Sequence, residues 1–327
     1  MNGKPWDKEQ GALPEAVAKD RERLLAHLVL YLKLILTAVF WGGTFIAARA
    51  ATPYSGPASA AFLRFAVASA FLAAFVLKSE GKIPMPQRRQ ILPVMMLALT
   101  GVFAYNIFFF CGLKTVPAGR ASLIVACNPA CITLFSCLVF REKIDALKIS
   151  GILLSLLGAS LVLSHGNPVE ILRGGLGTGE LYIVGCVASW VCYSLVGKVV
   201  MRGLSPLLSV TYACALGAIL LLPPALHEGM AEEFAHYPFV YWAGIFYLGF
   251  FGSALGFIWY YEGIKAIGLS RAGIFINIVP VSAVAMAYVL LHEAVDASLA
   301  GGAVLVFLGV YLMNRQPRPR GYSRNQP

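Results

Sequence analysis

The side chains that could do chemistry in this chain are mostly aromatic rings, hydroxyls and amides set inside long apolar runs. Trp41 and Thr44 share one helical face by their spacing, and Trp190, Tyr193 and Ser194 repeat that arrangement further along. A face that combines rings with hydroxyls could line a site for one small solute. Helix packing or a place at a membrane interface is the alternative for any single ring, and helix bridging for an amide. The same reasoning adds the candidates Tyr105, Asn106, Phe109, Trp259, Tyr260 and Asn277.

A single cation, Arg64, stands well inside one of these runs. It lies about eight residues into the run, roughly 12 Å deep at the rise of an α-helix. No Asp or Glu lies deep in any run to neutralise it, and a charge at such depth is a functional hypothesis by default. Its counter-charge could be a substrate carboxylate. Snorkelling to an interface and capping of backbone carbonyls are the alternatives.

Catalytic and cofactor-binding patterns are missing from the sequence. The five histidines lie in loops or at the ends of the apolar runs, and no phosphate-binding loop, metal cluster or nucleophile beside a base is present. We therefore expect no enzyme activity, no metal, no cofactor and no direct use of ATP. A proton relay would need a carboxylate or histidine at mid-membrane, so facilitated export down a gradient is the expected mode.

The composition predicts a membrane protein. Of 327 residues, 58% are hydrophobic and only 13% charged, with a mean hydropathy of +0.73. The net charge of +10 does not indicate nucleic acid, because most Lys and Arg lie in short segments between apolar runs or at the chain ends. All seven cysteines fall inside apolar runs without metal spacing, as packing residues do.

Ten apolar runs have about the length that crosses a bilayer as a helix. Alternate connecting segments hold most of the Lys and Arg, which predicts that both termini are cytoplasmic. We expect a cytoplasmic tail at 1–28, a first five-helix repeat at 29–164, an external linker at 165–179, a second repeat at 180–315 and a basic cytoplasmic tail at 316–327. The expected spans are 29–50, 57–77, 91–112, 120–140, 147–164, 180–200, 206–226, 239–262, 271–291 and 298–314.

The chain contains one phrase twice, at an offset of 151 residues. Five expected spans separate the copies, and because five is odd, a duplicated unit must insert upside down relative to the first. Pro129 and Pro280 lie within matched spans, where each removes a backbone donor. They are candidate hinges for alternating access, and fixed kinks are the alternative. The repeated pairs include Lys114/Lys265, Arg120/Arg271, Pro129/Pro280, Glu142/Glu293 and Asp145/Asp296.

Several of these motifs together resemble the ten-helix EamA-type members of the drug/metabolite transporter superfamily. They are WGGTF at 41–45, FLRF at 62–65, the glycine–arginine–alanine–serine entry at 119–122 with its counterpart at 270–273, and the E-x-x-D after each fourth helix. The resemblance implies an all-α polytopic membrane protein with two inverted five-helix repeats, a central cavity and export of small metabolites. Among its members, the chain looks most like bacterial amino-acid exporters, including those for aromatic amino acids.

The expected function is therefore export of amino acids by alternating access, in the plasma membrane of a bacterium. A carrier of phosphorylated metabolites or nucleotide sugars is the alternative within transport, although Arg64 alone is thin support for phosphate. A lipid scramblase or a structural membrane protein is the alternative from another class. We expect the lipid bilayer and a small-molecule substrate as partners, no nucleic acid, and a monomer or weak homodimer.

Overall fold

The computed structural model describes residues 12–140, 145–167, 176–200, 203–267, 272 and 275–314. Within these ranges the chain is helical throughout its regular elements, as apolar spans must be when the membrane offers their backbone no partners. The elements are α1 (Ala12–Ala51), α2 (Pro57–Glu80), α3 (Arg88–Leu97), η2 (Ala98–Ala104), α4 (Tyr105–Leu113), α5 (Ala118–Val125), α6 (Asn128–Phe140), α7 (Ala146–Leu163), α9 (Thr178–Val200), α10 (Pro206–His227), α11 (Met230–Glu233), α12 (Phe239–Phe246), η3 (Tyr247–Leu255), α13 (Gly256–Ile267), η4 (Phe275–Asn277), α15 (Ile278–Leu291) and α16 (Ala297–Asn314).

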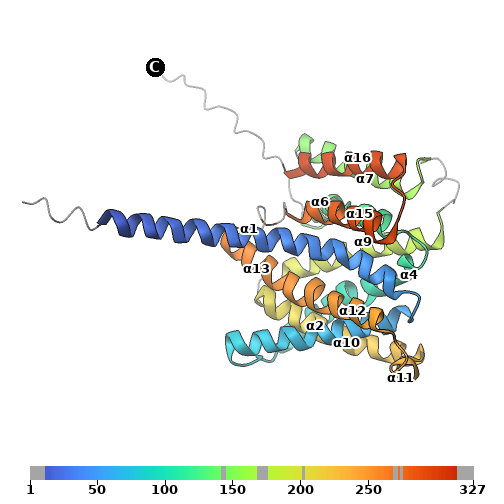
Figure 1. Ribbon diagram of the computed structural model, residues 1–327, viewed down its shortest axis with the longest axis horizontal. Helices are drawn as coiled ribbons and strands as arrows, with labels where there is room; N and C mark the ends of the chain where they lie inside the picture. The colour runs from blue at the N-terminus through green and yellow to red at the C-terminus, as the bar shows by residue number, and fades with distance from the viewer. Residues whose placement is uncertain are drawn as a thin grey trace, which may run out of the picture.

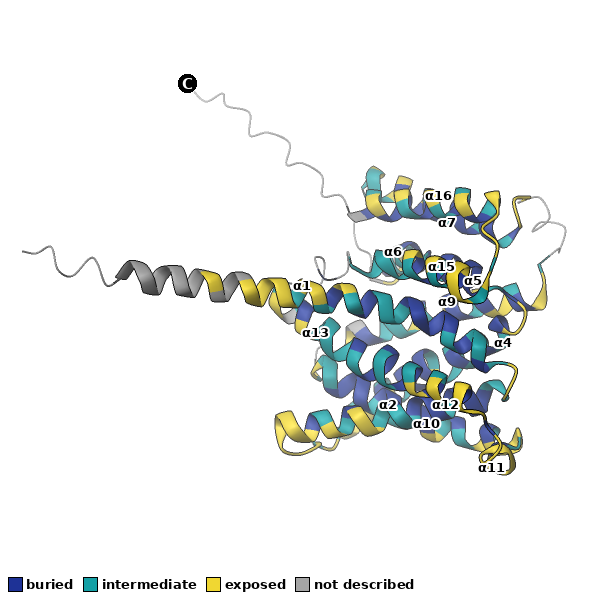
Figure 2. Ribbon diagram, viewed as in Figure 1, coloured by how far each residue is buried: buried dark blue, intermediate teal, exposed yellow. Residues whose placement is uncertain are grey.

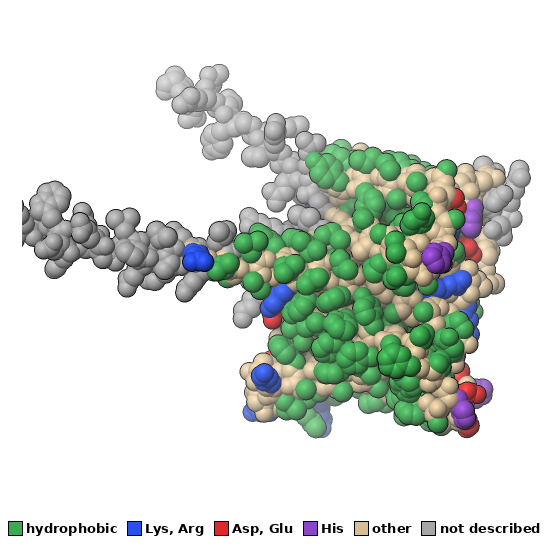
Figure 3. Space-filling view, in the orientation of Figure 1, with side chains coloured by type: hydrophobic (Ala, Val, Ile, Leu, Met, Phe, Trp, Pro, Cys, Tyr) green, Lys and Arg blue, Asp and Glu red, His purple; other side chains and the backbone are tan. Residues whose placement is uncertain are grey.

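Ten apolar spans are built from these elements. In the described part of the chain, eight helices are long and apolar enough to cross a membrane, and two shorter apolar ones follow at Phe275–Leu291 and Ala297–Met313. Apolar side chains cover the middle of the visible face, while charged ones gather toward its two ends (Figure 3). The prediction of an all-α polytopic membrane protein is confirmed. The first helix is longer than expected, because α1 begins at Ala12, within the predicted tail. Its N-terminal part extends past the bundle (Figure 1).

The packing partners follow the inverted repeat. Helix α1 lies against α12, η3, α13 and α15, and its counterpart α9 lies against α3, η2, α4, α5 and α6. Helices α2 and α10 pack together, as do α7 and α16 at one side of the bundle (Figure 1). The buried residues gather where these helices meet, and the exposed ones lie on the outer faces (Figure 2).

Small residues let α7 and α16 approach closely. A Cβ added to Gly151 would lie 2.6 Å from the Gly309 carbonyl, and one added to Gly158 would lie 2.7 Å from the Gly302 carbonyl. The earlier glycine of α7, Gly151, lies beside the later glycine of α16, Gly309, and the later one, Gly158, lies beside Gly302. The two helices therefore run antiparallel, as an upside-down copy requires.

Both matched prolines follow an interruption of their span. Helix α5 ends at Val125 and α6 begins at Asn128, which puts Pro129 in the first turn of α6. In the second repeat the 3₁₀ segment η4 precedes α15, and Pro280 lies in the first turn of that helix. A first turn tolerates proline because its N–H groups have no partner within the helix.

Candidate functional site

The first aromatic cluster joins α1 to α13. The Trp41 indole donates a hydrogen bond to the Gly252 carbonyl (2.9 Å), and its ring centroid lies 5.7 Å from that of Phe257 and 5.3 Å from that of Tyr260. The Thr44 hydroxyl donates to the Trp41 carbonyl (2.6 Å). Trp41 as a whole is half-buried.

The second aromatic cluster joins α9 to α4. The Trp190 ring lies 5.1 Å from that of Tyr193 and 5.4 Å from that of Tyr105. Tyr105 stacks on Phe109 at 5.8 Å, and Phe109 in turn meets Phe45 of α1 at 5.1 Å. Rings from both repeats therefore form a connected layer across the bundle.

Two glycines show that the clusters are related by the repeat. A Cβ on Gly252 would lie 2.5 Å from Thr44, and a Cβ on Gly101 would lie 2.1 Å from Tyr193. Gly101 and Gly252 are separated by the repeat offset, and Thr44 and Tyr193 follow their tryptophans by the same spacing. Each glycine makes room for the neighbouring helix, in agreement with the packing expected of such residues.

Arg64 lies between the two repeats. Its side chain is buried: Nε donates to the Ser253 hydroxyl (3.2 Å) and Nη1 donates to the Asn106 side-chain oxygen (3.1 Å). The guanidinium carbon also lies 5.1 Å from the Phe65 ring centre. Among the described residues, no carboxylate lies within ion-pair distance of it. The guanidinium bonds to side chains inside the bundle and does not snorkel to an interface, so its charge has no counter-charge among the residues that the structure describes.

Both partners of Arg64 belong to spans that contain a π-helical segment. The Asn106 amide, just after η2, donates to the Val102 carbonyl (2.7 Å), and the Ser253 hydroxyl, within η3, donates to the Leu248 carbonyl five residues back (3.0 Å). Such segments add a residue to a turn, rotate the helix that follows and occur often at functional sites. Sequence reasoning missed Ser253 and both segments, and the glycines at 101, 249 and 252 were the available signal.

Three predicted residues stand outside this arrangement. The Trp259 ring centroid lies 5.8 Å from that of Phe40 and 6.0 Å from the Lys33 ammonium nitrogen. Among the described residues it makes no ring contact with either aromatic cluster. Asn277 is the last residue of η4 and is half-buried. It is not one of the hydrogen-bond partners of Arg64, which are Ser253 and Asn106. The Ser194 hydroxyl donates to the Trp190 carbonyl of its own helix (2.7 Å). The binding role of all three stays a prediction.

The repeated phrase makes contacts across the repeats where α5 begins. Buried Arg120 donates to Asp296 (2.7 Å) and to the Val162 carbonyl. Glu293 accepts from the backbone N–H groups of Ala118 (2.7 Å) and Gly119 (2.9 Å), a favourable position for a carboxylate at a helix start. The repeat-related contact would involve Arg271 of the second repeat and Glu142 of the first, and both lie outside the described residues.

A hydrogen bond from the Ser298 hydroxyl is the main cause that lowers the pKa of the Asp296 carboxyl, with further contributions from the Leu299 N–H and Arg120. A lowered pKa keeps the carboxylate charged at neutral pH. The ion pair with Arg120 is therefore lost only as pH falls through that lowered value.

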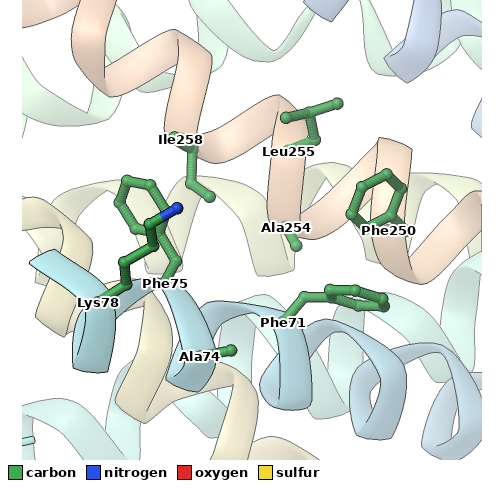
Figure 4. Close-up of a pocket in the computed structure, with 8 residues that line it drawn as sticks. All are labelled: Phe71, Ala74, Phe75, Lys78, Phe250, Ala254, Leu255 and Ile258. Atoms are coloured by element: carbon green, nitrogen blue, oxygen red, sulfur yellow. The ribbon is translucent and has the colours of Figure 1, made fainter.

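Two pockets lie on the outside of the bundle. One is a groove of about 260 Å³ between α2 and the η3–α13 segment, and its wall is apolar except for the Lys78 ammonium (Figure 4). The second lies beside α15 and α16. In the part of the chain that the structure describes, no group of three or more His, Cys, Asp or Glu residues could hold a metal ion. The Arg64 region is a meeting point of buried polar side chains, Arg64, Asn106 and Ser253.

This chain is similar to known proteins both in sequence and in fold. The model of the EamA-like transporter family matches residues 28–164 and 177–315. The chain is 29% identical over 286 residues to "Uncharacterized transporter YyaM" of Bacillus subtilis, covering 88% of this chain and 93% of that protein. It is 26% identical over 294 residues to "Probable terminal-alkyne amino-acid exporter" of Streptantibioticus cattleyicolor, covering 90% and 96%.

A further relative and one solved structure complete the comparison. The chain is 26% identical over 296 residues to "Probable amino-acid metabolite efflux pump" of Salmonella typhimurium, covering 85% of this chain and 92% of that one. One crystal structure shares its fold with a TM-score of 0.58 at 20% identity, covering 86% of this chain and 96% of the solved one. Because the family model matches most of the chain in two consecutive copies, the protein belongs to the EamA-like transporter family.

Proposed function

We propose that this transporter exports amino acids and related carboxylate-bearing metabolites by alternating access around the Arg64 region. The observation that carries the proposal is the buried guanidinium of Arg64, held by Asn106 and Ser253 and without a carboxylate partner among the described residues. A substrate carboxylate would supply the missing charge, and a guanidinium binds a carboxylate with good geometry. The names of two relatives, an amino-acid exporter and an amino-acid metabolite efflux pump, support this substrate class.

The surroundings of Arg64 favour a substrate with an apolar side chain. Half-buried rings of Trp41, Tyr105, Trp190 and Tyr260 lie on α4 or on helices that pack against α4 or η3, the elements that contain the Arg64 partners Asn106 and Ser253. Burying an apolar side chain between such rings is favourable by roughly 1.5–3 kcal/mol. A phosphorylated substrate would call for several cations, whereas Arg64 is one. A scramblase would need a polar furrow toward the lipid, and the face in Figure 3 is apolar across its middle.

The same proposal includes a cellular setting. We infer that the chain lies in the inner membrane of a bacterium with both termini in the cytoplasm, because Lys and Arg concentrate in the segments on that side. Substrate then leaves the cell through a site contacted by both repeats, as is typical when inverted repeats face each other.

Uptake of labelled amino acids into proteoliposomes tests the proposal. We expect the wild type to carry zwitterionic and carboxylate-bearing solutes better than lipophilic cations. Arg64→Gln should reduce transport of every carboxylate substrate about ten-fold or more, whatever its side chain. Lys78→Gln, which removes an exposed cation from the end of the same helix, is the matched control and should leave transport unchanged. Equal transport of quaternary ammonium dyes by the wild type would contradict the proposal.

A further inference from the structure

The fourth span is interrupted in the middle of the bundle. Helix α5 (Ala118–Val125) ends two residues before α6 (Asn128–Phe140) begins. Pro129 has no N–H group, so the Val125 carbonyl loses the donor that a continuous α-helix would provide. The interruption lies about ten residues into the span, roughly 15 Å from its start at the rise of an α-helix.

Two further backbone bonds shift at the same place. The N–H of Cys127 donates to the Ile124 carbonyl (3.2 Å), three residues back, so the Leu123 carbonyl loses its α-helical donor. The N–H of Ala130 donates to the Cys127 carbonyl (3.0 Å), so the Ala126 carbonyl loses its donor as well. The interruption therefore concentrates carbonyl oxygens at the C-terminal end of α5, where the helix dipole is negative.

The side chain of Asn128 adds another acceptor. It is 6% exposed, and its Oδ1 atom has no hydrogen-bond partner among the described residues. Its neighbours Cys127 and Cys131 pack against the main core, while Ala130 packs against a second core beside α7 and α16. Asn128 is on the side of α6 opposite Ala130 and so faces the main bundle. A buried amide oxygen without a partner is unfavourable, and a bound hydrogen-bond donor would remove that cost.

The acceptor-rich interruption fits a ligand that donates hydrogen bonds and carries positive charge. It contains no carboxylate among its described side chains, and hard divalent cations usually take carboxylate ligands. A primary ammonium group has three donors and suits amide and carbonyl oxygens. We propose that Asn128 and the interruption after α5 bind the α-ammonium group of an amino-acid substrate. This rests on the proposed function, in which Arg64 holds the carboxylate.

The depths of the two sites are compatible with one substrate. Arg64 is seven residues from the start of α2, roughly 10 Å, and Asn128 is ten residues from the start of α5, roughly 15 Å. Both helices begin on the same side of the membrane, because the chain crosses it twice between the start of α2 and the start of α5. The two groups that would hold a zwitterion therefore lie within about one helical turn in depth.

Paired substrates test this site. Phenylalanine and 3-phenylpropionate share the ring and the carboxylate and differ in the ammonium group. We expect wild-type proteoliposomes to take up phenylalanine with a KM about ten-fold lower than that for 3-phenylpropionate. Asn128→Leu should raise the KM for phenylalanine about ten-fold and leave that for 3-phenylpropionate unchanged. Asn128→Asp retains acceptor oxygens and adds charge, so it should preserve or increase the preference for phenylalanine.

The controls separate this site from general damage and from the proposed function itself. Thr133→Val removes one hydroxyl from the same helix, where it donates to the Pro129 carbonyl, and should leave the KM ratio unchanged. Equal loss of both substrates in Asn128→Leu and in Asn128→Asp would show a structural role and overturn the inference. A sodium requirement that disappears in Asn128→Leu, with the preference for phenylalanine intact, would assign the site to Na⁺ and overturn it too. If the wild type carries neither compound and no other amino acid, the proposed function fails and this site falls with it.

Discussion

At the scale of single residues, the two tryptophans combine packing with partial access. The Trp41 ring is fixed by its bond to Gly252 and by Phe257, and the residue stays half-buried. Trp190, also half-buried, holds the equivalent place beside Tyr193 in the second repeat. A ring that is held firmly and is only half covered is suited to contact an apolar substrate side chain with little loss of side-chain entropy.

Trp41→Ala and Trp190→Ala should therefore weaken transport of large apolar amino acids about ten-fold or more. Loss of roughly 1.5–3 kcal/mol of apolar contact accounts for the size of the effect. Transport of alanine or serine should change much less. The measurement is initial uptake into proteoliposomes across an amino-acid panel. Tyr288→Ala, which removes an exposed ring from α15, is the control. Equal losses for small and large substrates would show that the tryptophans act in packing alone.

At the scale of elements, the pseudo-symmetry depends on glycines that allow helices to touch. Gly302 and Gly301 are neighbours on α16, yet they face different surroundings. A Cβ on Gly302 would lie 2.3 Å from Val162 and 2.8 Å from the Gly158 carbonyl, whereas a Cβ on Gly301 would lie 3.5 Å from Leu161. The first position cannot accept a methyl group without moving a helix, and the second can.

Gly302→Ala should lower the thermal stability of the purified protein, because inserted methyl groups in tight packing cost about 1–3 kcal/mol. Gly301→Ala should be neutral or slightly stabilising, since alanine is the better helix former. The melting temperature of both variants in the same detergent, beside the wild type, measures the difference. A Gly301→Ala variant less stable than Gly302→Ala would contradict the antiparallel α7–α16 contact.

At the scale of the whole molecule, the odd number of helices per repeat gives each copy of the repeated phrase a different membrane face. Arg120 and Gly119 of the first repeat contact Asp296 and Glu293 of the second, which joins α5 to the connection between α15 and α16. Glu228 makes a similar contact near the same face, accepting from the N–H groups of Ala58 (3.1 Å) and Ser59 (2.8 Å) at the start of α2. Carboxylates at helix starts thus tie the halves together at this end.

The proposed orientation predicts which loops face the outside. A cysteine at Glu232 should react with a membrane-impermeant thiol reagent on intact cells, whereas one at Gln87 should react only after the membrane is opened. Both positions are exposed in the structure, so access depends on the side of the membrane and not on burial. A tag at either terminus should behave like Gln87. Labelling of the C-terminus on intact cells would be incompatible with ten spans and cytoplasmic ends.

Hydropathy, charge and a constant offset were enough to predict the number of spans, the repeat and the place of Arg64 within the second span, because a bilayer selects these local properties directly. It also indicated that Trp41 and Trp190 are related, since their spacing to neighbouring residues survives the duplication. The limits of α2, α7 and α10 were predicted closely for the same reason, with proline or a polar residue at their starts.

The contacts that these residues make depend on how the helices pack in three dimensions. The bond from Arg64 to Ser253 joins two repeats, and it depends on a π-helical segment whose hydrogen-bond register cannot be obtained from hydropathy. The interruption ahead of Pro129 and the unpartnered oxygen of Asn128 depend likewise on which carbonyls neighbouring N–H groups reach. Such contacts arise from the packing of helices far apart in sequence, and one chain read in order contains no direct signal for them.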